Sequence, residues 1–298
     1  MTSPPRTEPD GAPGLSPALQ RWLQARQPVR FGPERDYGPF VFQQPDGRLD
    51  GLSVDMLRLV QARTGLQVRE LPAAPLRELL AAARTRQVDL LSSLRPTPER
   101  AEYLRFSQPY VSVPALLVRR ADDAVVGLAQ LAGVAVAVGD GYAVEAPMRQ
   151  RHPAVRWVPM ADDGLALTAL LQGAVQAVVV DAASLAFLVR SRGLGGLRAD
   201  GPVGFEYTLS FGVRADWPEL VEVINRGIQL IGKQERQRVL DRWLTPLPAL
   251  AEAATGSWAV RWGGALALLP VLTLGGLWLR RRRLRAQKRP PDTGDRLG

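Results

Sequence analysis

The chain has 298 residues, of which 46% are apolar and 22% charged, so it can bury the core of one large domain or two modest ones. The absence of cysteine excludes disulfides, thiolate zinc sites and a cysteine nucleophile; the single histidine, His152, excludes multi-histidine metal sites, and we expect no metal and no cofactor. The net charge is +9, and +6 of it lies in residues 280–298, which contain seven Arg and one Lys against two Asp. No aromatic residue stands among these charges to stack on bases, so the sequence does not predict a nucleic-acid partner.

The first half of the chain alternates between predicted strands and helices. Residues 1–27 form an expected leader, disordered at first and ending in a short helix over Ser16–Arg26. Extended segments are predicted at 29–32, 40–43, 68–71 and 88–91. Helices are predicted to begin near Leu52 and Leu76, and Thr97-Pro98 begins another with good capping chemistry.

A second series of alternations begins near Leu128. Strands are predicted at 134–138, 155–158 and 177–180, helices at 143–151 and before Gly173, a further extended segment at 206–213, and helices at 220–231 and 235–243. This order predicts an α/β fold of two lobes, each a mainly parallel sheet flanked by helices. We expect lobe 1 at about 28–118 and 212–248, and lobe 2 at about 119–211.

Residues 258–279 are the most apolar stretch and predict a transmembrane helix, because 22 residues at ~1.5 Å each cover the ~30 Å hydrocarbon layer. The arginines at 280–283 mark the cytoplasmic side. We therefore expect a single-pass protein of the inner membrane, with residues 28–248 in the periplasm and a basic tail, 280–298, in the cytoplasm. Gly263 and Ala267 form a small-xxx-small face that would suit a homodimer.

The leader contains no apolar segment of the kind that a signal peptide needs. This topology requires export of the periplasmic part. We therefore expect that the true start lies upstream, or that the chain is a piece of a longer protein.

The most specific pattern is VDLLSSLRPTPERAEYLRFSQPY, residues 88–110. It resembles the signature of family 3 solute-binding proteins, which are bilobed Venus flytrap receptors for polar amino acids, and DYGPF (36–40) and DGRLDGLSVDML (46–57) fit the same family. The resemblance runs from about residue 29 to about 244. The segments LSPALQRWLQARQPVRFG (15–32) and GYAVEAPMRQRHPAV (141–155) are most similar to flytrap domains of BvgS-type sensor kinases.

Arg100 and two serines stand within this signature. A guanidinium after a proline-primed helix start can grip a carboxylate through two parallel hydrogen bonds, and the resemblance implies that Arg100 clamps the ligand's α-carboxylate. The alternative is a surface arginine paired with Glu99 or Glu102.

Ser92 and Ser93 end a buried strand, where the family places ligand-contacting hydroxyls, and Ser93 is the better match. The alternative is a loop serine that caps the next turn.

Two further ligand contacts are implied by the resemblance. Tyr37 matches the family's aromatic lid residue, with a core residue at the rim as the alternative. Asp181 follows the strand at 177–180 and matches a carboxylate that holds the ligand's ammonium group. The alternative for Asp181 is an N-cap of the helix that begins at Ala182, and the two roles are compatible.

The sequence departs from the family pattern at two places. Arg95 stands where the amino-acid binders often have a hydroxyl, and a second cation in the cleft would favour a ligand with more negative charge, unless Arg95 turns outward. Asp140-Gly141-Tyr142 replaces a threonine pair after a glycine. Tyr142 therefore becomes a candidate ligand contact, and the expected ligand is a small carboxylate or a polar amino acid.

Three classes of function are compatible with these residues. The leading hypothesis is an extracytoplasmic sensor domain anchored by one membrane helix, which signals by lobe closure to a signalling partner. The alternative is the substrate-binding component of an amino-acid ABC transporter, with a permease as its partner. A dehydratase on the same fold would need an acid in the cleft, such as Glu145 or Glu206, and we expect no enzymatic activity.

Overall fold

The computed structural model describes residues 14–244, which lie within one compact unit, residues 1–247. The predicted transmembrane helix at 258–279, the basic tail and most of the predicted disordered leader lie outside the described residues. Between residues 14 and 244, no helix is both long enough and apolar enough to span a bilayer.

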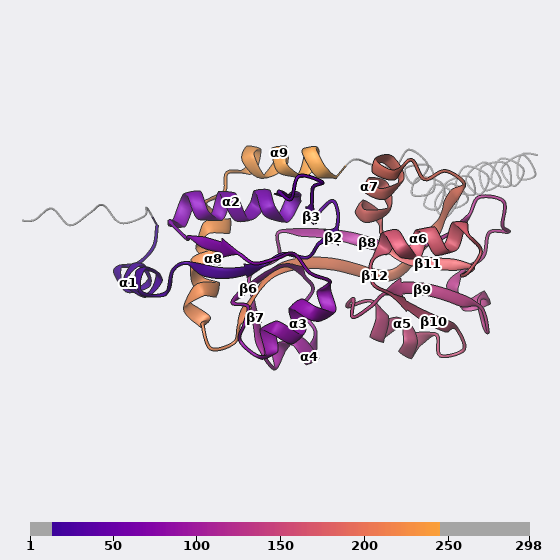
Figure 1. Cartoon of the computed structure of the whole chain (residues 1–298), viewed down its shortest axis with the longest axis horizontal. Coiled ribbons are helices and arrows are strands. Elements are labelled where there is room, and N and C mark those ends of the chain that lie inside the picture. Colours follow the sequence, from indigo (N-terminus) through magenta and orange to yellow (C-terminus); the bar gives the residue numbers. More distant parts are fainter. Residues whose placement is uncertain (1–13, 245–298) are drawn as a thin grey trace, which may run out of the picture. The chain divides into compact units, whose positions relative to one another are not determined.

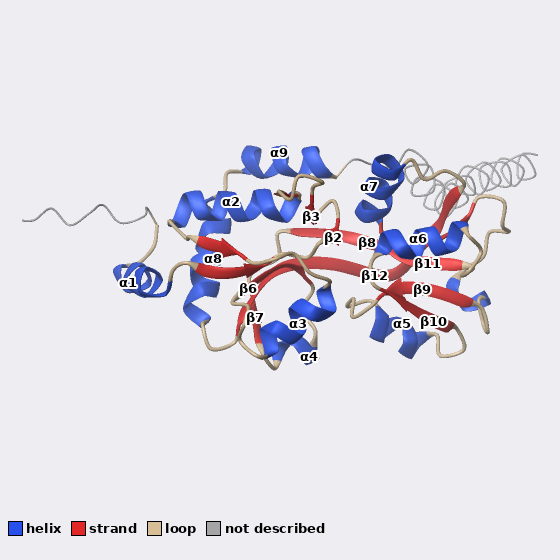
Figure 2. Cartoon of the chain, in the orientation of Figure 1, coloured by secondary structure: helices blue, strands red, loops and turns tan. Residues whose placement is uncertain are grey.

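The first lobe is built around the short parallel strands β1, β5 and β6, with helices on both faces (Figures 1 and 2). Its strands and helices are α1 (Pro17–Arg26), β1 (Val29–Gly32), α2 (Leu52–Thr64), β5 (Val68–Glu70), α3 (Leu76–Arg84), β6 (Leu90–Leu94), α4 (Pro98–Ala101), β7 (Leu104–Phe106), α8 (Pro218–Leu230) and α9 (Lys233–Trp243). A small antiparallel sheet accompanies them: β2 (Asp36–Tyr37), β3 (Val41–Gln43) and β4 (Leu49–Asp50).

The second lobe repeats this plan around the parallel strands β9, β10 and β11. Its elements are the 3-10 helix η1 (Leu128–Gln130), β9 (Ala135–Gly139), α5 (Glu145–Arg151), β10 (Arg156–Met160), α6 (Asp163–Leu171), β11 (Ala177–Asp181) and α7 (Ala182–Arg192). The residues of β9 and β11 are buried, as strands covered on both faces must be.

Two long strands join the lobes: β8 (Val111–Arg120) and β12 (Leu197–Arg214). They pair with each other in antiparallel fashion; β8 also pairs with β11 of the second lobe, and β12 with β6 and β7 of the first. The strand order is therefore β10-β9-β11-β8-β12-β6-β1-β5. The two sets of parallel strands, one in each lobe, match the predicted α/β order. They belong to one continuous hydrogen-bonded sheet rather than to two. The residue boundaries expected for the lobes stay a prediction.

The extended segment predicted at 206–213 is much shorter than the observed strand, which begins at Leu197. The register of β12 against β8 shifts between Ala199 and Gly201 and again between Pro202 and Glu206. Glycine and proline are typical of such bulges, and they hid the strand from its sequence pattern. The strand predicted at 88–91 also differs, since β6 begins at Leu90.

The residue before β6, Asp89, carries a buried carboxylate. Its Oδ2 accepts hydrogen bonds from the backbone N of Arg30 (2.9 Å) and from that residue's Nε (2.8 Å). Its Oδ1 accepts from Arg30 Nη2 (2.7 Å) and from Arg214 Nη1 (3.0 Å), and these contacts lower the pKa of Asp89 against the cost of its burial. One carboxylate thus fixes β1, β6 and β12, the strands whose far ends carry the site described below.

We expect Asp89→Asn to lower the free energy of unfolding at pH 7 by about 2–3 kcal/mol. The asparagine carries no charge, and it offers the two arginines one acceptor oxygen where the carboxylate offers two. Asp216→Asn is the matched control. It removes an exposed partner of the same Arg214 and should cost about 0.5 kcal/mol. Urea unfolding of the two variants measures both values, and equal losses would contradict the role assigned to Asp89.

Candidate ligand-binding site

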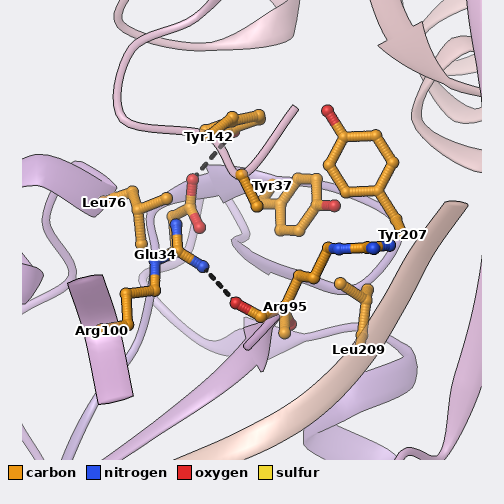
Figure 3. Close-up of a pocket in the computed structure, with 10 residues that line it drawn as sticks. Glu34, Tyr37, Leu76, Arg95, Arg100, Tyr142, Tyr207 and Leu209 are labelled. Carbon is orange, nitrogen blue, oxygen red and sulfur yellow. Dashed lines mark hydrogen bonds between the residues drawn. The ribbon is translucent and has the colours of Figure 1, made fainter. Parts of the chain in front are cut away.

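The ends of the parallel strands bring predicted and unpredicted residues into one small cavity between the lobes (Figure 3). Of the seven predicted site residues, five line it: Tyr37, Ser93, Arg95, Arg100 and Tyr142. The other lining residues were not predicted: Glu34, Leu76, Ala143, Tyr207 and Leu209. The space left among them is about 10 Å³, enough for about one water molecule.

Arg100 is the buried centre of this site. Thr97 caps the α4 helix by accepting a hydrogen bond from the Arg100 backbone N (3.2 Å), as its sequence predicts. The Arg100 side chain turns inward and is only 4% exposed, so the alternative of a surface arginine is wrong. Its Nη1 donates to the carbonyl oxygen of Arg95 (2.8 Å) and its Nη2 to that of Gly141 (2.9 Å). Burial lowers the pKa of Arg100, opposed in part by the nearby acid Glu34.

The loop Asp140-Gly141-Tyr142, which follows β9, contacts the first lobe with each of its three residues. Asp140 forms an ion pair with Arg77 of α3, and the carbonyl of Gly141 accepts from Arg100. Tyr142 donates its hydroxyl proton to Glu34 Oε1 (2.9 Å), and its ring centroid lies 5.3 Å from that of Tyr37. The segment that departs from the family's threonine pair therefore acts as a bridge between the lobes.

Glu34 is the functional residue that sequence reasoning missed most clearly. It lies two residues beyond β1 and is buried. Burial raises its pKa to about 7, although the hydrogen bond from Tyr142 and the charge of Arg100 favour the ionised form. A carboxylate just after a buried parallel strand was the available signal, since the carboxyl ends of such strands face the crevice of this class of sheet.

Ser93 belongs to a buried hydroxyl network behind the cavity. Its backbone N donates to the hydroxyl of Tyr110 (2.8 Å), its Oγ donates to Ser53 Oγ (2.8 Å), and its φ of 59° places it in the left-handed region. Ser92 is also buried, but it does not line the cavity. The next helix is capped by Thr97 rather than by either serine.

Asp181 lies outside the residues that line the cavity. It is the N-cap of α7, where its Oδ1 accepts from Ser184 N (2.8 Å), so the N-cap interpretation is confirmed. Its Oδ2 is buried without a hydrogen-bond partner among the described residues, as is Oδ2 of Asp163. Burial raises the pKa of Asp181 to about 6, and burial together with the charge of Asp181 raises that of Asp163 well above its usual range.

The side chain of Arg95 makes no contact with Arg100, although its backbone carbonyl accepts from Arg100 Nη1. Its side chain extends toward Tyr207 in Figure 3, and its guanidinium carbon stands 4.2 Å from the centroid of the Phe205 ring. It is half-buried and lines the cavity, so it does not turn fully outward. The structure thus places one predicted cation against backbone carbonyls and the other on an aromatic ring.

We expect Glu34→Gln to stabilise the protein at pH 8 and to have little effect at pH 4. The raised pKa of Glu34 means that the folded state binds more protons than the unfolded state, so its contribution is present below about pH 4.5 and lost as pH rises toward 7. Between these pH values the wild type loses about 3 kcal/mol of unfolding free energy through Glu34, and the variant does not. Thermal unfolding across this pH range measures the loss, with the exposed Glu102→Gln as control. A dependence of unfolding free energy on pH that is the same in Glu34→Gln and wild type would contradict this prediction.

Comparison with known proteins identifies similar chains. The family described as bacterial extracellular solute-binding proteins, family 3, matches residues 29–246. The virulence sensor protein BvgS of Bordetella pertussis is 26% identical over 233 residues, which cover 78% of this chain and 19% of BvgS. The chain therefore spans about a fifth of the length of that relative. The L-arginine-binding protein of Pseudomonas aeruginosa is 32% identical over 111 residues, covering 37% of this chain and 42% of that protein.

Solved structures show the same fold. The periplasmic VFT2 domain of B. pertussis BvgS has a TM-score of 0.70 at 26% identity, covering 76% of this chain and 98% of that one. A histidine kinase sensor domain with similarity to periplasmic binding proteins has a TM-score of 0.70 at 22% identity, covering 75% and 99%.

Proposed function

The chain belongs to the bacterial extracellular solute-binding proteins of family 3, and on that premise we propose that it is the ligand-sensing flytrap domain of a membrane-anchored receptor. It recognises a small carboxylate or a polar amino acid and signals by a change in lobe closure. Residues 28–248 stand in the periplasm, residues 258–279 cross the inner membrane, and the basic tail lies in the cytoplasm. The family is one of binding and sensor domains, and the chain acts by binding rather than by catalysis.

The observation that carries a sensor role is an aromatic bridge from the second lobe to the end of α9. The ring of Phe187, on α7, lies 4.9 Å from that of Phe42, on β3, and Phe42 lies 5.9 Å from Trp243, the last residue of α9. Trp243 is held in place by a hydrogen bond from its Nε1 to Asp55 (2.8 Å). A movement of the second lobe therefore reaches the segment that leads toward the predicted membrane helix.

The same bridge is connected to the cavity. Phe187 packs on Gly38, where an added Cβ would lie 2.2 Å from the ring, so only glycine permits this approach. Gly38 follows Tyr37, whose ring faces the bridging Tyr142. A ligand that rearranges the Tyr37–Tyr142 contact would thus act on the residue next to Gly38, against which Phe187 packs.

Similarity to BvgS supports the sensor over the transporter, because it extends over most of this chain, whereas similarity to the L-arginine-binding protein covers about a third of it. The amino-acid-binding relatives support a small polar ligand. The signalling partner of the proposed receptor is either a segment of a longer parent protein or a separate membrane protein.

A distance measurement tests lobe closure. The chain contains no cysteine, so Gln87→Cys on the first lobe and Gln172→Cys at the end of α6 give one clean pair of exposed spin labels. We expect at least one member of a panel of polar amino acids and small carboxylates to shift the distance distribution and to raise the unfolding temperature. A panel that produces neither change contradicts the proposal. Ligand-dependent co-purification with a permease would favour the transporter alternative.

Phe187→Ala tests the aromatic bridge. Removing the ring deletes the contact that ties α7 to Phe42, so we expect the distance distribution of the same label pair to broaden toward longer distances. Val189→Ala, on the same helix but outside the bridge, is the control and should leave the distribution unchanged. Identical distributions in the two variants would show that the bridge does not restrain the lobes.

A further inference from the structure

A second cavity adjoins the first and is far larger. It measures about 600 Å³, against about 10 Å³ for the inner one, and we call it the vestibule. The two cavities share Arg95, Arg100, Tyr142 and Ala143. An organic molecule of several carbon atoms fits in the vestibule in this conformation, whereas the inner cavity holds about one water.

The charges of the vestibule are almost all committed to partners. Among its lining residues, Glu99 forms an ion pair with Arg84 (2.6 Å), and Glu145 forms one with Arg149 (3.0 Å). The two Nη atoms of Arg100 donate to backbone carbonyls. Of the five charged residues that line the vestibule, Arg95 alone has neither an ion pair nor a side-chain hydrogen bond within the described part of the chain.

The surroundings of Arg95 leave its donors available. Its guanidinium carbon lies 4.2 Å over the Phe205 ring, and none of its N–H groups makes a hydrogen bond within the described part of the chain. Those N–H groups match the two oxygens of a carboxylate. Phe205 is buried, so the ring holds the guanidinium at the boundary of both cavities.

The other walls of the vestibule are largely apolar. They include Pro96, which precedes α4, Pro98 at the start of α4, Ala146 and Pro147 of α5, and the Phe205 ring. Such walls favour a hydrocarbon body on the ligand. Both carboxylates that line the vestibule, Glu99 and Glu145, are paired with arginines, so a ligand ammonium group would compete with Arg84 or Arg149 for them.

We propose that the vestibule binds a monocarboxylate with an apolar body, whose carboxylate is anchored by Arg95 rather than by Arg100. This inference rests on the proposed function and narrows its ligand to organic acids that lack an amino group. It makes Arg95 the residue that decides ligand class, while Arg100 connects the lobes.

The test compares propanoate, butyrate, pentanoate and hexanoate, with hexanamide as the neutral control. Each is titrated against the full chain in phosphatidylcholine nanodiscs and followed by saturation-transfer NMR. We expect affinity to rise about threefold per added methylene, and hexanamide to bind at least about tenfold more weakly than hexanoate. Arg95→Gln should weaken hexanoate binding by about tenfold or more, whereas Arg105→Gln, a control that removes an exposed arginine of the same lobe outside the vestibule, should change it by less than about twofold.

Several results would overturn the inference: no hexanoate binding to the wild type, equal binding of hexanamide, or equal losses in the two variants. If Arg95→Gln unfolds at a lower temperature, Arg95→Lys replaces it and should retain more affinity than the glutamine variant. A polar amino acid that shifts the lobe distance equally in wild type and Arg95→Gln overturns this inference and leaves the proposed function standing. Hexanoate binding that depends on Arg95 but leaves the lobe distance unchanged supports the site and contradicts lobe closure as its signal.

Discussion

The burial of one guanidinium constrains the rest of the site. A charged group removed from water needs partners for its donors, and Arg100 finds them in two backbone carbonyls, one on its own lobe and one on the loop after β9. That second partner brings Asp140 and Tyr142 with it, because they flank Gly141. The inner cavity is small because the groups that would otherwise hold a ligand are used to hold the lobes.

Three buried acids add an electrostatic cost to this arrangement. Glu34, Asp163 and Asp181 are all buried, and burial raises the pKa of each. One oxygen of each aspartate has no hydrogen-bond partner among the described residues. Such groups oppose folding when ionised, and the interlobe hydrogen bond to Glu34 recovers only part of that cost. The contacts between the lobes therefore form against an opposing electrostatic cost.

The two cavities differ in size and in the groups that line them. Around the inner cavity, the lobes are tied by Arg100 and Tyr142, and next to it the aromatic bridge runs from Gly38 through Phe187 to Trp243. The vestibule offers the larger volume and the one uncommitted cation among its lining residues. Arg95 lies on the boundary between them, so an anion bound there adjoins the contacts that set lobe closure.

Local chemistry made much of this protein predictable from sequence. Ser16, Thr97 and Asp181 each cap a helix by accepting a hydrogen bond from a residue three positions later. The apolar segments predicted the bounds of the parallel strands to within a few residues of those observed. The signature at 88–110 and the family resemblance located five of the seven predicted residues in one cavity. Pairings between distant residues were decided only by the tertiary structure. Tyr142 meets Glu34 across 108 positions and Gly141 meets Arg100 across 41, and no local pattern records which donors a buried cation or acid will find. Those partners depend on how two lobes, joined by two long strands, pack against each other, since burial sets both the cost of each charge and the few groups within reach of it.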